Sequence, residues 1–222
     1  MAVPVAEAFR ASYDALVRLV VVVDDEASWR PSGCRGWAVR DVAFHCLSDA
    51  QRALVALNSP TALPADRDAV SYWADWAPDE RAAAQGRRFV RVAGSMFLDF
   101  SVLRDLFVDT LTAVQHAARL VPDPQPLRTQ GHVLVCQDLL STLAVEATLH
   151  HIDLLAADDQ LPRPSPAGLA LARHTVEGLL GQALPASWTD EHCARITTGR
   201  TDVDDHERRM LGTAAHRLPL FA

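Results

Sequence analysis

The stretch AVEATLHHIDLLAA, residues 144–157, places a carboxylate and two adjacent histidines inside a run of apolar residues. Side chains three or four positions apart share one face of a helix. Glu146, His150 and Asp153 therefore continue the face that is formed by Cys136, Leu139, Leu143 and Ala157. This pattern predicts a helix that turns a polar group toward its neighbours. A buried carboxylate is costly unless it is paired or binds a metal, so Glu146 requires such a partner.

Three further segments show helical spacing of apolar residues. The first stripe is Phe9, Tyr13, Leu16, Val20 and Val23, the second lies within residues 39–57, and the third is Met96, Phe100, Leu103, Phe107, Leu111, Val114 and Ala118. We expect the fourth helix, which holds the opening stretch, to run from about Thr129 to Ala157. Because essentially no alternating strand pattern is present, the sequence predicts an all-α four-helix bundle.

The remaining segments are predicted to surround this bundle. SYWADWAPDERAAAQGRR, residues 71–88, fits either a short helix or an ordered excursion. A fifth helix is expected over residues 167–184. The tail after it has too few apolar residues for a core of its own and is expected to pack on the bundle, with Thr201 or Asp202 capping a last short helix. We therefore divide the chain into a bundle, residues 1–160, and a C-terminal helix and tail, residues 161–222.

The composition excludes several functions. The chain has 222 residues, 49% of them hydrophobic, and a formal net charge of −7, which argues against nucleic-acid or anionic-membrane partners. It contains no lysine. A phosphate-loop lysine, a Schiff-base lysine and a lysine general base are therefore all excluded.

The cysteines indicate a reducing compartment. Cys34, Cys46, Cys136 and Cys193 stand far apart without a C-x-x-C pair, and no signal peptide precedes them, so we expect a cytoplasmic protein. The apolar run LVVVV, residues 19–23, is far too short to cross a membrane.

Glu146 and His150 stand at i and i+4, so one helix presents both side chains to the same point. His45, in GWAVRDVAFHCL, is the best candidate for a third ligand from a facing helix. Two imidazoles and one carboxylate suit zinc or another divalent metal and leave one coordination position open. Asp41 and Asp153 are candidates to accept the second imidazole protons. No residue is assigned a catalytic role from the sequence.

A structural interpretation of these residues stays open. E-x-x-x-H is common by chance, and a lone histidine on a helix is usually a core or boundary residue. His151 diverges from His150 by about 100°, so we expect it to be exposed on the flank and not to bind metal. Cys46 and Cys136 are expected in the core. The tryptophans either line a pocket mouth or anchor loops; they are Trp29, Trp37, Trp73 and Trp76.

Two motifs together resemble the maleylpyruvate isomerase N-terminal family of DinB-like metal proteins. They are WRPSGCRGWAVRDVAFHCL, residues 29–47, and VEATLHHIDLLAA, residues 145–157. The resemblance implies a DinB-like four-helix bundle with a divalent metal, typically zinc, on His45, Glu146 and His150. It also implies a low-molecular-weight thiol as cosubstrate, mycothiol in actinobacteria. The chain departs from the two-domain isomerases after Leu184, where only a short segment remains, so maleylpyruvate itself is not assigned as the substrate.

The sequence therefore favours a metal-dependent thiol S-transferase or thiol-dependent isomerase that acts on a small electrophile. One alternative is a non-catalytic metal-binding bundle, such as a stress-response or binding protein. Another is a metal-dependent hydrolase that needs no thiol. A homodimer is left open, as is the reach of the RITTGR stretch, which contains Arg195 and Arg200.

Overall fold

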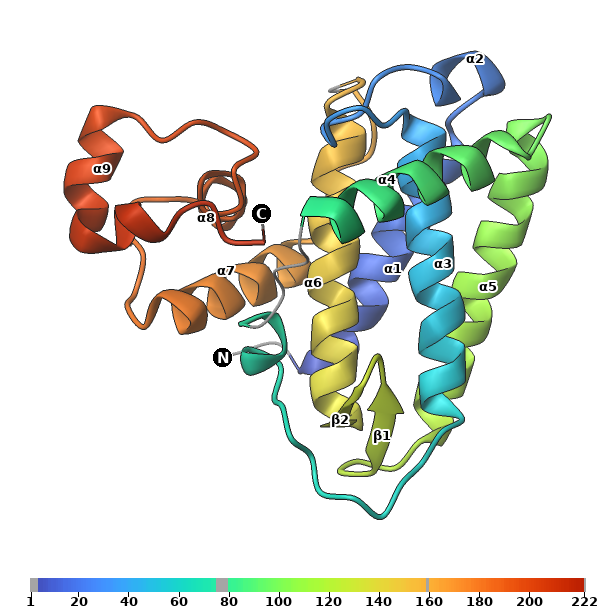
Figure 1. The fold of residues 1–222 in the computed structure, drawn as a ribbon, viewed down its shortest axis with the longest axis horizontal. Coiled ribbons are helices and arrows are strands. Elements are labelled where there is room, and N and C mark those ends of the chain that lie inside the picture. Colours follow the sequence, from blue (N-terminus) through green and yellow to red (C-terminus); the bar gives the residue numbers. More distant parts are fainter. Residues whose placement is uncertain (1–3, 75–79, 159, 222) are drawn as a thin grey trace.

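In the computed structural model, which describes residues 4–74, 80–158 and 160–221, four long helices form a bundle. They are α1 (Val5–Val21), α3 (Val39–Leu57), α5 (Phe100–Leu120) and α6 (Cys136–Leu155). Helix α1 packs against α6 and α3 against α5, and further contacts of α3 with α6 and of α1 with α5 close the ring (Figure 1). A short helix, α2 (Asp25–Ser28), joins α1 to α3. The predicted all-α bundle is confirmed.

The predicted apolar stripes form the core of this bundle. All five residues of the first stripe are buried, and α3 has the predicted bounds, Val39–Leu57. In α5, the side chains from Phe100 to Val114 that follow helical spacing are at most 1% exposed. Local periodicity therefore predicted correctly which face of each of these helices is removed from water.

The predicted start of the fourth helix was wrong. Residues before Cys136 form an antiparallel hairpin of β1 (Pro126–Thr129) and β2 (His132–Val135). The turn residues Gln130 and Gly131 both have positive φ, 46° and 86°, as the two-residue turns of tight hairpins require. Leu127 and Leu134 are fully buried, so the hairpin covers one end of the bundle (Figure 1).

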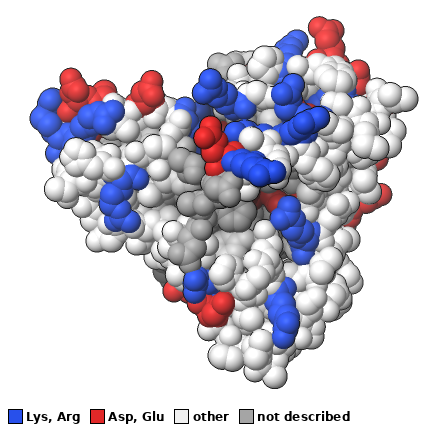
Figure 2. Space-filling view, viewed as in Figure 1, with Lys and Arg blue, Asp and Glu red and all other residues white. Residues whose placement is uncertain are grey.

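The segment 71–88, which fitted either a helix or an ordered excursion, contributes to two elements. They are a 3-10 turn, η1 (Ser71–Trp73), and a helix, α4 (Glu80–Ser95). Helix α4 crosses α3 and carries the exposed arginines 81, 87, 88 and 91. Figure 2 shows basic side chains gathered on the part of this face where α4 lies.

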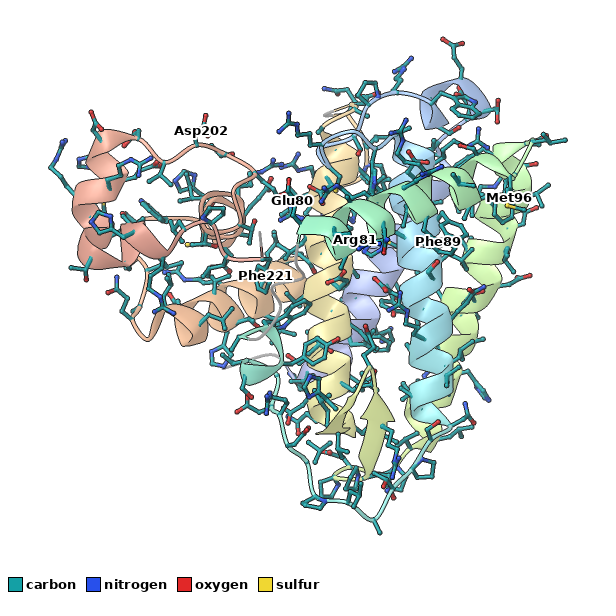
Figure 3. All side chains as sticks on the ribbon, in the orientation of Figure 1. Glu80, Arg81, Phe89, Met96, Asp202 and Phe221 are labelled. Atoms are coloured by element: carbon teal, nitrogen blue, oxygen red, sulfur yellow. The ribbon has the colours of Figure 1, made fainter. Side chains whose placement is uncertain are left out.

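The third predicted helix starts later than expected. Met96, the first residue of its predicted stripe, is outside α5 and 75% exposed (Figure 3). Helix α5 begins only at Phe100 because Asp99 caps it, accepting the Ser101 N–H.

The C-terminal part forms a second layer beside α6. It contains α7 (Pro166–Leu180), α8 (Asp190–Thr197), α9 (Asp205–Leu211) and η2 (Gly212–Arg217). Helix α7 packs against α1 and α6. It ends at Leu180, four residues before the predicted position, because Gly181 takes φ of 68° and closes it. Helix α8 is an element that the sequence analysis missed.

Helix α7 and the tail build a hydrophobic cluster together. The cluster consists of Val176, Leu180, Leu184, Cys193, Ile196, Leu211, Ala214 and Ala215. The tail supplies too few apolar residues alone, but α7 contributes one side of the cluster. The cap of the last helix was also predicted wrongly: Asp204, not Thr201 or Asp202, accepts the Glu207 N–H, and the Glu207 carboxylate binds the Asp204 N–H in return.

The chain end returns to the bundle. The ring of Phe221 packs edge-on against Trp73, with 4.9 Å between centroids (Figure 3). In the described part of the chain, no helix combines the length and apolar character that crossing a membrane demands.

Candidate metal centre

Facing positions of α3 and α6 bring the three predicted ligands together. The Nε2 atoms of His45 and His150 each lie 3.3 Å from the same carboxylate oxygen, Oε1 of Glu146. The two imidazole rings meet edge to face with centroids 4.6 Å apart. One potential ligand atom from each residue lies within 4.8 Å of the other two. Helical periodicity placed Glu146 and His150 correctly on one face, and the packing of α3 on α6 supplies His45.

This cluster fits a divalent metal in both chemistry and spacing. Ligands about 2.0–2.1 Å from a tetrahedral zinc ion lie about 3.3–3.4 Å from one another. The two distances of 3.3 Å match that separation. Two neutral imidazoles and one carboxylate neutralise only part of a divalent charge and leave room for a further ligand. The side chains of His45 and Glu146 are 23% and 26% exposed, so an exogenous ligand has access to the cluster.

The local electrostatics keep the three groups paired. Burial alone raises the pKa of Glu146, but hydrogen bonds and charges from His150 and His45 outweigh it and hold this pKa well below its usual range. Burial alone lowers the pKa of His150, yet its hydrogen bonds, first that to Asp153, raise it well above the ordinary value. The partly buried carboxylate thus has the partners that its position requires.

Asp153 contacts His150, as the sequence predicted. The two residues share a hydrogen bond of 2.9 Å between His150 Nδ1 and Asp153 Oδ2. Burial raises the pKa of Asp153, but the His150 hydrogen bond and the Arg200 charge lower it far below normal, so the carboxylate stays ionised. An ionised acceptor keeps a proton on Nδ1, so Nε2, which faces Glu146 Oε1, is the nitrogen that remains for a metal.

The role predicted for Asp41 is wrong. Its Oδ2 accepts the Ala38 N–H at 2.9 Å, so this carboxylate satisfies the start of α3 and is not bonded to His45. Asp41 is in the first turn of α3, where free backbone N–H groups attract a carboxylate. Asp49, one turn after His45, lies beside that ring instead, with Oδ2 3.3 Å from Nε2. Its spacing of four from His45 was a signal that sequence reasoning missed.

Two other residues at the site were not predicted. Cys34 Sγ lies 3.9 Å from His150 Nδ1, and burial raises the pKa of this thiol although His150 opposes the shift. Arg200 donates to both carboxylate oxygens of Asp153. Cys34, His150 and Asp153 also lie close enough together to form a ligand group. Because Arg200 already occupies both Asp153 oxygens, we interpret that group as support for His150.

His151 is not part of the cluster, but the expectation that it is exposed was wrong. Its side chain points away from Glu146, is 1% exposed, and lies 2.7 Å from the Pro162 carbonyl oxygen through Nε2. Burial lowers its pKa to about 4. The helix phase was correct, but the segment that follows α6 covers this flank.

The tryptophans have different roles. Trp37 lies beside His45, with ring centroids 5.3 Å apart. Trp29 is 52% exposed and stacks on the buried Arg40 guanidinium, whereas Trp73 is buried. Trp76 lies outside the described residues.

A small cavity lies on the bundle side of the site. It is lined by Tyr13, Leu16, Cys46, Asp49, Leu111, Leu143, Glu146 and Ala147, and its volume is about 10 Å³. Such a space holds about one water molecule. The inner side of the cluster therefore has no room for a larger molecule. Both Cys46 and Cys136 are core residues, as expected.

Comparisons with known proteins identify related sequences and folds. Residues 9–155 match the model of the mycothiol maleylpyruvate isomerase N-terminal domain. Two solved structures are similar: a mycothiol-dependent maleylpyruvate isomerase, with a TM-score of 0.54, and a mutant of that enzyme, with a TM-score of 0.55. Each is 18% identical in sequence, and the alignments cover 79% of this chain and 68% of the other. No curated protein matches the chain.

Proposed function

This chain belongs to the mycothiol maleylpyruvate isomerase N-terminal domain family, and we propose that it is a metal-dependent enzyme that uses a low-molecular-weight thiol. The proposed reaction is a thiol-dependent isomerisation of a small electrophile or an S-transfer to one. Mycothiol is the proposed thiol because the family model and both similar structures carry its name. Maleylpyruvate is not proposed as the substrate of this chain.

One observation carries the proposal: three potential ligand atoms converge from two facing helices, and their side chains remain partly accessible. A purely structural zinc site is normally closed by four protein ligands, whereas a catalytic site has three and an open position. His45, Glu146 and His150 would hold the metal, for which we propose zinc. When bound, such a metal supplies a Lewis acid that favours the ionised form of a thiol or water beside it.

The surrounding residues would orient these ligands. Asp153 holds the His150 proton on Nδ1, which directs Nε2 to the shared position. Trp37 covers one side of the His45 ring. The tiny volume of the inner cavity leaves the solvent side for the thiol and the electrophile. Four expectations stay predictions. They are the cytoplasmic location, the absence of nucleic-acid and membrane partners, a homodimer and the division at residue 160.

Metal analysis followed by thiol titration tests this function. Protein purified without added metal should contain about one divalent ion per chain. After cobalt substitution, mycothiol should change the spectrum, because a thiolate bound to cobalt adds a sulfur-to-cobalt charge-transfer band that a water ligand does not give. An unchanged spectrum with mycothiol, glutathione and cysteine alike would favour a hydrolase or a non-catalytic metal protein. Conjugation assays with a panel of electrophiles then define the substrate class.

A further inference from the structure

The segment that follows α8 reaches the far side of a proposed metal ligand. Helix α8 ends at Thr197, and Gly199, with φ of 73°, reverses the chain. The N–H groups of Arg200 and Thr201 both bond to the Arg195 carbonyl oxygen, at 2.8 and 3.2 Å. The backbone of Arg200 is therefore fixed by the end of α8, outside the region that matches the family model.

The Arg200 side chain meets Asp153 in a two-pronged contact. Its Nε donates to Oδ1 at 2.8 Å and its Nη2 donates to Oδ2 at 2.7 Å. The Asp153 side chain is 2% exposed and that of Arg200 is 16% exposed. Planar, two-pronged arginine–carboxylate pairs fix orientation as well as charge. This contact therefore sets the plane of the Asp153 carboxylate.

The same carboxylate is the partner of His150. Oδ2, which accepts from Arg200, also accepts from His150 Nδ1 at 2.9 Å. The backbone of Asp153 is held too, because its carbonyl oxygen accepts the Gly33 N–H at 2.8 Å. A Cβ on Gly33 would come within 3.1 Å of Asp153 Oδ1, so a glycine at this position leaves the carboxylate its place.

From these contacts we propose that Arg200 is a positioning residue of the metal centre, acting through Asp153 on the orientation of His150. The proposal rests on the metal site proposed above. It makes the C-terminal part a component of that site, since Arg200 fixes Asp153, Asp153 fixes the Nδ1 proton of His150, and Nε2 then points toward Glu146. A contact that only tied the tail to the bundle would leave metal affinity unchanged.

Metal affinity of purified full-length variants tests the proposal. Arg200→Gln should raise the dissociation constant for zinc, measured by chelator competition, about 10- to 100-fold, the usual range for loss of an outer partner of a metal ligand. Its cobalt derivative should show a shifted visible spectrum. Arg200→Lys, which retains charge but not the planar fork, should have an intermediate effect.

Arg195→Gln is the matched control, because Arg195 lies nearby in α8 and pairs with Glu191 instead of Asp153. It should change zinc affinity less than about 3-fold, within the range of a surface pair. Equal affinities for wild type, Arg200→Gln and Arg200→Lys would overturn the proposal. Wild-type protein that binds no zinc would instead overturn the proposed metal function.

A double-mutant cycle tests the route through Asp153. Asp153→Asn should weaken zinc binding, and adding Arg200→Gln to it should weaken binding much less than Arg200→Gln does alone. Fully additive effects would mean that Arg200 does not act through Asp153, which would overturn the proposal. Should Arg200→Gln fail to fold by circular dichroism, the cycle with Arg200→Lys answers the same question.

Discussion

His45 on α3 and His150 on α6 face the same oxygen of Glu146 at the same distance, yet their surroundings differ. His150 is held through Nδ1 by Asp153, and Asp153 is held by Arg200. In the described part of the chain His45 has no hydrogen bond to Nδ1; Trp37 packs on its ring and Asp49 lies at its Nε2 side. The difference indicates that α6 provides a rigid half of the site and α3 a more adaptable half.

The largest effect should come from the carboxylate that both halves share. Glu146→Ala removes the only anionic member of the ligand group, so metal should fall below detection in elemental analysis after dialysis. Glu7→Ala, an exposed glutamate on α1, is the control and should keep its metal. Stoichiometric metal in Glu146→Ala would show that the two histidines do not bind the ion together with Glu146.

The two histidines should then differ in how much affinity they contribute. His150→Ala removes the ligand on the rigid half and should cost more than the about 10- to 100-fold typical of outer partners. His45→Ala should also weaken binding strongly, but less, because Asp49 lies beside the vacated position. Zinc competition titrations measure both values. A greater loss for His45→Ala would reverse the assignment of the rigid and adaptable halves.

His151 provides a pH test on the opposite flank of α6. Its pKa of about 4 in the folded protein lies below the ordinary value of 6.5, so both states are neutral above pH 6.5 and the unfolded chain takes up the proton first as pH falls. The free energy of unfolding should therefore fall by on the order of 3 kcal/mol between pH 6.5 and 4 because of this residue. Urea unfolding of wild type and His151→Gln across this range measures the difference.

In that comparison the free energy of unfolding of His151→Gln should depend less on pH than that of wild type, while its metal content stays at the wild-type level. Parallel pH profiles for the two proteins would show that His151 is not kept neutral by burial. Loss of metal from His151→Gln together with retention by His150→Ala would instead mean that the phase assigned to α6 is wrong.

The smallest effect should come from Asp41, which binds the backbone at the start of α3, in the adaptable half. Asp41→Ala removes the bond to the Ala38 N–H and should destabilise the protein by about 1 kcal/mol, as is typical for lost helix-end partners. Its zinc affinity should equal that of wild type because Asp41 is not bonded to His45. Thermal unfolding and zinc titration of the same preparation separate the two effects, and a clear drop in affinity would restore Asp41 to the site.

Helical periodicity by itself determined the bundle faces and two members of the site. Residues 39–57 were predicted with their observed bounds, and the spacing of four put Glu146 and His150 on one face, because a helix repeats every 3.6 residues whatever packs against it. His45 followed from the requirement for a ligand on a facing helix. All three residues lie within residues 9–155, the region that matches the family model.

Only the tertiary structure decided where the hairpin forms and which partners the side chains of α6 contact. The hairpin before α6 forms where Leu127 and Leu134 find a place under the bundle. His151 is buried because the chain returns over it at Pro162. Arg200 stands 47 positions from Asp153 and meets it because α7 packs against both α6 and α8 and brings the end of α8 to this site. Local spacing specifies the direction of a side chain, whereas its partner depends on how distant elements pack, and no period in the sequence encodes that.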